Sequence, residues 1–478
     1  MIDSLFCKID NTLLSALKII NDNAMGAVFV VDDNYKLYGV ITDGDIRRSI
    51  LNDISLYMTA GDIVSSNFVY GLDNENYESI MKKITHNIKI IPIVDKNNKV
   101  VDYFEYRHEA YFPAAIPNLN GNEFKYLTDA FLSSWISSKG EYLHRFESGF
   151  SKYSDCQYGV SVSNGTVALH LALIALGVGY GDEVIVPDLT FAATINAVIH
   201  ANATPVIVDI EENSWCIDPK SIEVAITNKT KVIIPVHIYG QPCDMDAIMG
   251  ISEKYNLRVI EDCAEAHGAM YGGKKVGCFG DIGCFSFYGN KVITTGEGGM
   301  CVTSSEEIYQ KMAVLRDHGM SKTKRYWHDI VGYNYRMTNL HAAIGLAQLE
   351  RIESIHKNRK KYENTYREVL NKDICLFQNN LTNRGRITWL VSILLNKKIN
   401  VDSCIILLRE KGIDARPFFY PLSDMPIYSQ YCNKKTSVAH KISERGINLP
   451  TYENLKSINE IKKIIEDVNC ELKAIINV

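Results

Sequence analysis

One lysine stands in a polar turn that follows an apolar stretch and precedes a group of glycines. It is Lys291, in Phe285-Ser-Phe-Tyr-Gly-Asn-Lys291-Val-Ile-Thr-Thr-Gly-Glu-Gly-Gly-Met300. The amine of a lysine held in this way can attack a carbonyl carbon and can also take up a proton. A carboxylate follows a second apolar stretch, at Asp262 in Val259-Ile-Glu-Asp262-Cys-Ala-Glu265. An amine and a carboxylate at the ends of two strands are suited to chemistry at a carbonyl group.

A third motif is suited to binding a phosphate group. In Ser163-Asn-Gly165-Thr166-Val167-Ala-Leu-His-Leu171, a glycine precedes an apolar helix. Glycine lets the backbone approach a ligand closely, and the free N–H groups at the start of a helix attract anions. The hydroxyl groups of Thr166 and Ser286 can add hydrogen bonds. Phe191 follows another strand end and can lie over the face of an aromatic ring.

Together these groups are the ones that pyridoxal 5′-phosphate requires. Lys291 can attach the aldehyde, and Asp262 can keep the ring nitrogen protonated so that the ring accepts electrons. Two unit charges about 4 Å apart interact by about 4 kcal/mol at an effective dielectric constant near 20, which is enough to hold that proton at neutral pH. The helix start at Gly165, Thr166 and Val167, with Ser286, would bind the phosphate. We therefore predict a pyridoxal phosphate enzyme that uses no metal, with Lys291 as its catalytic residue.

From Phe112 onward, short apolar strands alternate with helices. We expect strands at residues 183–187, 205–209, 231–236 and 257–261, and helices at 166–176, 193–200 and 245–254. Strands that are apolar along their whole length indicate an α/β fold with a mostly parallel sheet, covered on both faces, that binds ligands at the carboxyl ends of its strands. A long helix is expected from about Asn339, a plausible N-cap, to Asn358. The predicted domains are a large one at 111–355 and a smaller α+β domain at 356–478.

The first 110 residues contain an internal repeat. A helical stretch, an apolar strand, a turn and a second strand occur at residues 12–42 and again at 77–104. The two halves resemble a CBS-domain pair, an α+β module that binds adenine nucleotides in many proteins. Gly39-Val-Ile-Thr42-Asp-Gly-Asp45 matches the motif of that family, which implies one site for a purine nucleotide at Thr42 and Asp45. The second half lacks these residues. In the alternative interpretation, Asp45 only caps the helix that follows it.

The rest of the chain, from about Ile116, resembles the DegT/DnrJ/StrS nucleotide-sugar aminotransferases. Besides the motifs above, Pro235-Val-His-Ile-Tyr-Gly-Gln-Pro242 and Ile260-Glu-Asp-Cys-Ala-Glu-Ala-His-Gly268 match that family in order and spacing. The resemblance implies fold type I, the aspartate-aminotransferase-like architecture, and a homodimer with shared active sites. It also implies that Phe191 stacks on the cofactor and that Asn334 reaches the cofactor phosphate of the other subunit.

Glu265 departs from the commonest pattern of this family, in which a glutamine contacts the 3′ oxygen of the cofactor. A carboxylate in that place has to be protonated or to bond differently. Glu265, with the Gly-Asn-Lys turn and Arg416-Pro-Phe-Phe-Tyr-Pro421, is most similar to the GDP-perosamine synthases, which aminate C4 of a GDP-linked 4-keto-6-deoxymannose. Arg416 and His267 are candidates for binding the substrate, although a histidine such as His267 can equally be a satisfied core residue.

Three functions remain open on this basis. The first is an aminotransferase that moves the amino group of glutamate onto a nucleotide-linked 4-keto-6-deoxy sugar, in the biosynthesis of a surface polysaccharide or O-antigen. The second is a sugar dehydratase or deaminase on the same scaffold; a related dehydratase carries histidine in place of Lys291. The third is a nucleotide-sensing regulatory protein with a vestigial enzyme domain, against which the intact Lys291 and Asp262 count.

Composition and charge exclude other classes. The net charge is −5 and the basic residues are scattered, so nucleic acid is not an expected partner. No apolar run reaches the roughly 18 residues of a membrane helix, and the N-terminus lacks the features of a secretory signal, so we expect a cytoplasmic protein. Twelve cysteines without a C-x-x-C pair argue against a zinc site or a disulfide framework, and we expect most of them to be reduced and buried.

Overall fold

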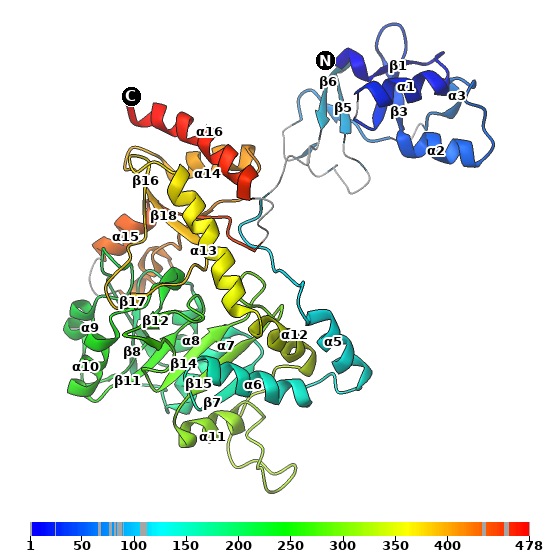
Figure 1. Ribbon diagram of the computed structural model, residues 1–478. Helices are drawn as coiled ribbons and strands as arrows, with labels where there is room; N and C mark the ends of the chain where they lie inside the picture. Colours follow the sequence, from blue (N-terminus) through cyan, green and yellow to red (C-terminus); the bar gives the residue numbers. More distant parts are fainter. Residues whose placement is uncertain are drawn as a thin grey trace. The chain divides into compact units, whose positions relative to one another are not determined.

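The computed structural model shows a chain that folds as two compact units, Met1–Glu109 and Ala110–Val478 (Figure 1). The structure describes residues 2–23, 25–65, 68–75, 79–80, 83, 88, 90–105, 112–432, 436–453 and 458–477. None of the helices in these ranges is long and apolar enough to cross a membrane.

The first unit is built from two sheets of the same design. In one, β1 (Phe6–Lys8) runs parallel to β2 (Ala27–Val31), which pairs antiparallel with β3 (Leu37–Thr42). The other repeats this order with β4 (Gly71–Leu72), β5 (Ile90–Val94) and β6 (Val100–Glu105), and both have a register shift at the end of the central strand. The strand pattern of the predicted internal repeat is therefore confirmed. The first half also contains η1 (Ile2–Leu5), α1 (Leu13–Asn23), α2 (Asp43–Leu51) and α3 (Ala60–Ile63). The helix expected near 77–85 lies largely outside the described residues.

The second unit contains a seven-stranded sheet with the order β7-β15-β14-β11-β10-β8-β9. Its strands are β7 (Tyr158–Val162), β8 (Glu183–Pro187), β9 (Thr204–Val208), β10 (Thr230–Ile233), β11 (Arg258–Asp262), β14 (Ile282–Ser286) and β15 (Gly299–Thr303). Only β15 runs antiparallel to its neighbours, so the predicted mostly parallel sheet is confirmed. All the other strands point their carboxyl ends to one edge.

Helices cover both faces of this sheet, because its strands are apolar on both sides. One face packs against α7 (Gly165–Ala175), α8 (Ala193–His200) and α11 (Glu306–Leu315). The other packs against α5 (Glu123–Leu132), α6 (Glu141–Tyr153), α9 (Pro219–Ala225), α10 (Met245–Tyr255) and α12 (Asn339–Leu349). The starts of α7 and α8 follow β7 and β8, so both helices begin at the edge where the parallel strands end.

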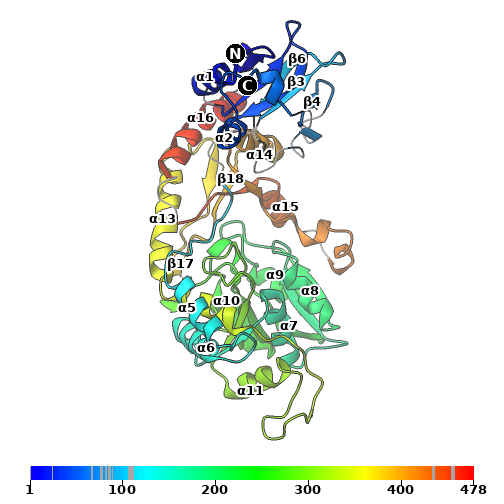
Figure 2. The same ribbon diagram turned by 90° about the vertical axis from the view of Figure 1, so that its right-hand side faces the viewer.

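The C-terminal part of this unit has a smaller antiparallel sheet. Its strands, in the order β16-β18-β20-β19, are β16 (Cys375–Phe377), β18 (Val391–Leu395), β20 (Gly446–Leu449) and β19 (Arg416–Pro417). The long helix α13 (Ile352–Val369) and α16 (Ile458–Asn477) pack against each other (Figure 2), and they share a core with α14 (Val401–Glu410). Short elements complete the chain: η2 (Ile238–Gly240), β12 (Met270–Tyr271), β13 (Lys274–Lys275), β17 (Arg384–Gly385), η3 (Leu422–Asp424), η4 (Ser429–Tyr431) and α15 (Ser437–Ser443).

Two expectations differ from this structure. The long helix from Asn339 to Asn358 is in fact two helices, α12 and α13, and the N-cap is Thr338, whose hydroxyl accepts a hydrogen bond from the backbone N–H of His341. The boundary expected near residue 355 therefore falls inside α13, and a division of the second unit at that point stays a prediction. Cys156 and Cys278 form a disulfide, with Cα atoms 5.8 Å apart. The two cysteines are 122 residues apart in the sequence, and the fold brings their loops together. A search for closely spaced cysteines could not have found this pair.

Candidate active site

A cavity of about 690 Å³ lies at the edge of the large sheet where the parallel strands end. Helix starts, strand ends and the turn after β14 all contribute to its wall. The wall includes most of the residues predicted from the sequence: Gly165, Thr166, Val167, Phe191, Asp262, Glu265, Ser286 and Lys291. Residues from distant parts of the chain meet here because parallel strands bring their carboxyl ends to one edge.

The start of α7 has the features of a phosphate cradle. Asn164 is the N-cap, and its side-chain oxygen accepts a hydrogen bond of 2.9 Å from the N–H of Val167. The N–H groups of Gly165 and Thr166 have no partner within the helix, since they belong to its first turn. A Cβ atom on Gly165 would lie 2.7 Å from the Cβ atom of Ser286, so only glycine lets the helix start close on the end of β14. Free N–H groups and a serine hydroxyl therefore meet at one point.

The amine of Lys291 faces a carboxylate and an aromatic ring. Its Nζ atom lies 3.7 Å from Oε1 of Glu265 and 4.2 Å from the centre of the Trp389 ring. The Trp389 indole N–H donates a hydrogen bond of 2.9 Å to the carbonyl of Asn290, which fixes the backbone just before the lysine. From the sequence, Trp389 was only a weak candidate and was not among the predicted site residues.

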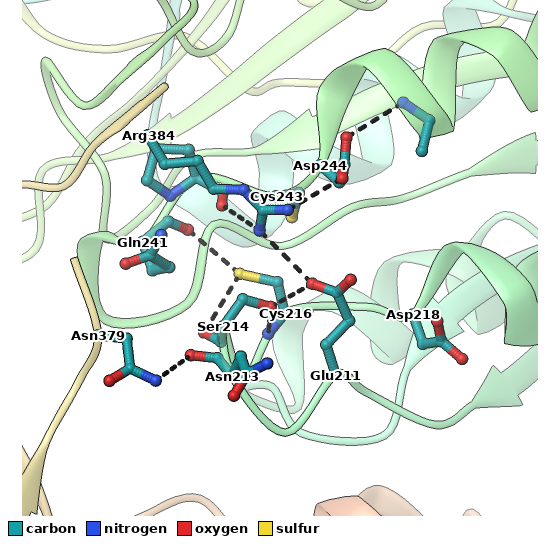
Figure 3. A network of polar contacts seen from close by, with 12 residues as sticks. Glu211, Asn213, Ser214, Cys216, Asp218, Gln241, Cys243, Asp244, Asn379 and Arg384 are labelled. Carbon is teal, nitrogen blue, oxygen red and sulfur yellow. Dashed lines mark hydrogen bonds and ion pairs between the residues drawn. The ribbon is translucent and has the colours of Figure 1, made fainter. Parts of the chain in front are cut away.

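A polar network holds the segment that leads to Trp389. The guanidinium group of Arg384 forms ion pairs with Asp244 at 3.0 Å and with Glu211 at 3.5 Å. Figure 3 shows this side chain reaching toward both carboxylates, with Asn379 bonded to the carbonyl of Asn213 nearby. Because Glu211 and Asp244 belong to loops beyond β9 and β10, the network ties this segment to the edge of the sheet that forms the cavity.

Asp262, the last residue of β11, is buried at the cavity wall. Its Oδ2 atom accepts a hydrogen bond of 2.8 Å from the hydroxyl of Thr194, and its Oδ1 atom accepts one of 3.1 Å from the N–H of Ala264. Burial raises the pKa of the Asp262 carboxyl, while these two hydrogen bonds and the charge of Lys291 act in the opposite direction. A cation bound against Asp262 would further favour the ionised carboxylate.

Glu265 stands between ionised and neutral. Burial raises its pKa to about 7, although the charge of Lys291 and a hydrogen bond from the backbone N–H of Tyr239 oppose this rise. That hydrogen bond, 2.8 Å long, leaves Oε1 facing the lysine amine. Near neutral pH, Glu265 can therefore either accept or donate a proton in the cavity.

A pH-dependent stability follows from Glu265 in the cofactor-free protein. Because the folded-state pKa lies above the ordinary value of 4.5, the folded protein holds this proton more tightly than the unfolded chain does. The resulting stability is fully present below pH 4.5 and is lost as the pH rises to about 7, in total by about 3 kcal/mol. We expect Glu265→Gln to lose this contribution to the pH dependence of the free energy of unfolding, measured by urea denaturation between pH 5 and 8. Identical pH dependence in the two proteins would contradict it.

His267 does not reach the cavity. Its ring is fully buried next to Phe150, Phe285 and Phe287. Its Nε2 atom lies 2.9 Å from the carbonyl oxygen of Ser286, so Nε2 must carry hydrogen and donate. Burial, together with the charge of Lys291, lowers the pKa of His267 to about 3, which keeps the ring neutral. This position does not fit the expected contact with a substrate; His267 supports the end of β14 from behind.

Two further predicted residues lie outside the cavity wall. Asn334 is exposed, and its side-chain oxygen accepts hydrogen bonds from the guanidinium group of Arg336. The side chain of Arg416 is largely exposed and pairs with Asp414 at 2.8 Å. A contact of Asn334 with the cofactor of a second subunit stays a prediction, as does a contact of Arg416 with substrate.

One group among the described residues has the donor atoms for a metal ion: His237, Glu261 and Cys263, within 4.8 Å of one another. Both oxygens of Glu261 already accept backbone N–H groups from the loop 277–280. The Nδ1 atom of His237 accepts the N–H of Cys243, so its Nε2 atom carries hydrogen and donates to Glu261 at 3.1 Å. These hydrogen bonds use the same lone pairs that a metal would need, so the cluster acts as a support for β11.

In the first unit, the motif residues Thr42 and Asp45 bond to each other. Thr42 is the N-cap of α2, and its hydroxyl donates to Asp45 at 2.6 Å in a capping box. Arg48 donates to the other oxygen of Asp45 at 2.6 Å. Burial opposes ionisation of Asp45, but the hydrogen bonds from Thr42 and Arg48 hold its pKa below the ordinary value. The capping interpretation of Asp45 is therefore observed directly.

The cavity fits pyridoxal phosphate by the chemistry of its wall. It combines an amine that can attach the aldehyde, a buried carboxylate that can pair with the ring nitrogen, and a helix start with free N–H groups that can bind the phosphate. The close approach of Gly165 to Ser286 gives the phosphate end its shape.

Comparison with known proteins identifies two regions. The model of the DegT/DnrJ/EryC1/StrS aminotransferase family matches residues 117–469, and a CBS-domain model matches residues 1–52. GDP-perosamine synthase of Escherichia coli O157:H7 is 45% identical over 75% of this chain and 98% of that protein, and that of Vibrio cholerae is 43% identical over 75% and 99%. The PLP-form of the putative sugar aminotransferase Spr1654 from Streptococcus pneumoniae has a similar structure, with a TM-score of 0.70, 27% identity and coverage of 77% and 99%.

Proposed function

The chain belongs to the DegT/DnrJ/EryC1/StrS aminotransferase family, and from this premise we propose that it aminates C4 of a GDP-linked 4-keto-6-deoxy sugar with glutamate as donor. Its cofactor is pyridoxal phosphate. The observation that carries the proposal is the single cavity that combines the Lys291 amine, the Asp262 carboxylate and the start of α7. The likeness to GDP-perosamine synthases supports the choice of sugar and nucleotide, and a role in making a surface polysaccharide or O-antigen.

Different residues of the cavity have different roles in such a reaction. When bound, pyridoxal phosphate supplies an aldehyde that can be joined to amines and a protonated ring that takes up electrons. Asp262 holds the proton at the ring nitrogen. Lys291, when its amine is free, acts as a general base: it takes a proton from the carbon that carries the amino group and gives a proton back at another atom. Glu265, 3.7 Å from that amine, can exchange a proton with it. The sugar gains the amino group, and glutamate leaves as 2-oxoglutarate.

A panel of keto-sugars tests the substrate. We expect the purified enzyme, given glutamate and equal concentrations of GDP-, UDP- and dTDP-linked 4-keto-6-deoxy sugars, to turn over the GDP-linked one fastest. The product mass should show that the keto oxygen is replaced by an amino group, with one 2-oxoglutarate formed for each product molecule. Faster turnover of a UDP- or dTDP-linked sugar would contradict the nucleotide assignment. Loss of a hydroxyl without consumption of glutamate would favour the dehydratase or deaminase alternative.

We further propose that the enzyme works as a homodimer. Helix α5 exposes the large apolar side chains of Phe124, Phe131 and Leu132. The loop at 326–331 exposes further apolar residues, and a cavity of about 1070 Å³ next to α5 includes Arg336 in its wall. Large apolar side chains that are exposed together on one helix and one loop are typical of a surface that another protein covers. A second copy of the chain is the proposed partner, with Asn334 near its active site.

For the first unit, we propose one purine nucleotide site at Thr42 and Asp45. A ligand would have to replace the bond of Arg48 to Asp45, because both carboxylate oxygens are in use. We expect calorimetry on the full-length protein to detect binding of AMP, ATP or GDP that Asp45→Ala abolishes. Asp62→Ala is the matched control, since Asp62 forms the same kind of capping box with Thr59 outside the motif. Binding that survives Asp45→Ala, or no binding, would leave Asp45 as a helix cap alone.

A further inference from the structure

We infer that Thr194 and Thr190 are positioning residues of the reaction: their hydroxyl groups form a directed chain that holds the Asp262 carboxylate ionised and aimed at the ring nitrogen of the cofactor. The inference rests on the proposed function, because it takes Asp262 as the partner of that nitrogen. Neither threonine was singled out from the sequence. Thr194 follows Phe191 by one helical turn, and nothing in the local spacing connects it to β11.

The contacts fix each oxygen of the carboxylate separately. Oδ2 accepts the hydroxyl of Thr194 at 2.8 Å, and Oδ1 accepts the N–H of Ala264 at 3.1 Å. Two donors on two different atoms prevent the carboxylate from rotating. Thr194 is fully buried at the start of α8, so its hydroxyl has no water to exchange with.

The number of available hydrogen atoms fixes the direction of the hydrogen bonds that link Thr190, Thr194 and Asp262. An ionised carboxylate only accepts, so the one hydrogen of Thr194 must point to Asp262. The oxygens of Thr194 and Thr190 are 3.0 Å apart, and therefore Thr190 donates in that pair. Thr190 itself is 1% exposed and belongs to the cavity wall. Hydroxyl groups in such a chain polarise one another, which strengthens the last bond to the carboxylate.

The hydrogen bond from Thr194 to Asp262 matters because Asp262 is buried. Burial favours the neutral acid, which cannot hold a proton at the ring nitrogen, and each donor to the charged form opposes that tendency. Among the ionisable groups that face Asp262, Lys291 and His237 favour its ionisation, and the like charge of Glu265 opposes it. A hydrogen bond to a charged group changes an equilibrium by about 10- to 100-fold.

Binding of two cofactors to the cofactor-free protein tests the inference. One is pyridoxal phosphate, and the other is its 1-deaza analogue, in which a C–H group replaces the ring nitrogen. Thr194→Val keeps the shape of the side chain without the hydroxyl and should weaken binding of pyridoxal phosphate by about 10- to 100-fold, while binding of the analogue stays unchanged. Thr194→Ser should restore most of the affinity. Thr303→Val, which removes a buried hydroxyl bonded to the carbonyl of Asp281 outside the cavity, is the control and should change neither.

Each other outcome has a defined meaning. If Thr194→Val weakens the binding of both ligands equally, α8 is merely displaced and the inference is overturned. The inference is also overturned if Thr194→Ser does not restore the affinity for pyridoxal phosphate. Asp262→Asn should discriminate between the two ligands in the same way, and its effect should not add to that of Thr194→Val. If Asp262→Asn does not discriminate, the proposed role of Asp262 fails instead. Thr194→Ala is the second variant in case the valine protein does not fold, with the same expected selectivity.

Discussion

Replacement of Lys291 by alanine is expected to abolish transamination, with a loss of at least about 10⁴-fold, the upper end of what one positioned general base contributes. The reason is geometric. The Lys291 amine is the only lysine amine among the described residues of the cavity wall, and Glu265 and the Trp389 ring hold it there. No other lysine amine in the described cavity wall can attach the cofactor or carry the proton.

The same variant should still bind pyridoxal phosphate weakly, since the start of α7 and Ser286 are unchanged. Turnover is measured by formation of 2-oxoglutarate, and retained cofactor by absorbance after gel filtration. Peptide mapping after borohydride reduction should find the cofactor mass on Lys291 of the wild type. Lys275→Ala is the matched control, because Lys275 also lies over an aromatic ring, that of Tyr153, but outside the cavity. Near-normal turnover by Lys291→Ala would disprove the assignment.

The second large effect is expected from Asp262→Asn. An ion pair about 4 Å long at an effective dielectric constant near 20 is worth about 4 kcal/mol, so turnover should fall by about 10³-fold. The free energy of unfolding of the cofactor-free protein should change by less than about 1 kcal/mol, because the amide keeps the bond to Thr194 and avoids the cost of burying a charge, which offsets the lost bond from the N–H of Ala264.

Asp188 offers a contrasting control for this experiment. It is a buried aspartate just beyond the end of β8, which β10 separates from β11 in the same sheet, but it lies outside the cavity wall. The N–H and hydroxyl of Ser423 and the hydroxyl of Thr436 all donate to it. Asp188→Asn should therefore lower stability and leave turnover per folded molecule largely intact. If the two variants lose turnover equally, the ring nitrogen takes its proton partner from elsewhere.

Several features were predictable from the sequence because they depend on local patterns. An apolar strand followed by a polar residue predicts a strand end, and parallel strands place such ends together. Lys291, Asp262 and the Gly165–Thr166 helix start each carry this signal, and the structure brings all three to one cavity. The repeat in the first unit was visible for the same reason, since each half contains its own strand pair.

Other features depended on contacts between distant segments. His267 stands two residues after Glu265, yet one faces the aromatic core behind β14 and the other faces the cavity. Trp389 meets Lys291 from a distant segment, which Arg384 ties to carboxylates of two other loops. The hydroxyl of Thr194 meets Asp262 because the start of α8 lies beside the end of β11. Sequence alone determined which residue types stand at strand ends and helix starts, since these depend on nearest neighbours along the chain. Only the tertiary structure decided which side chains touch, because burial and hydrogen-bond partners are set by segments that pack together from far apart.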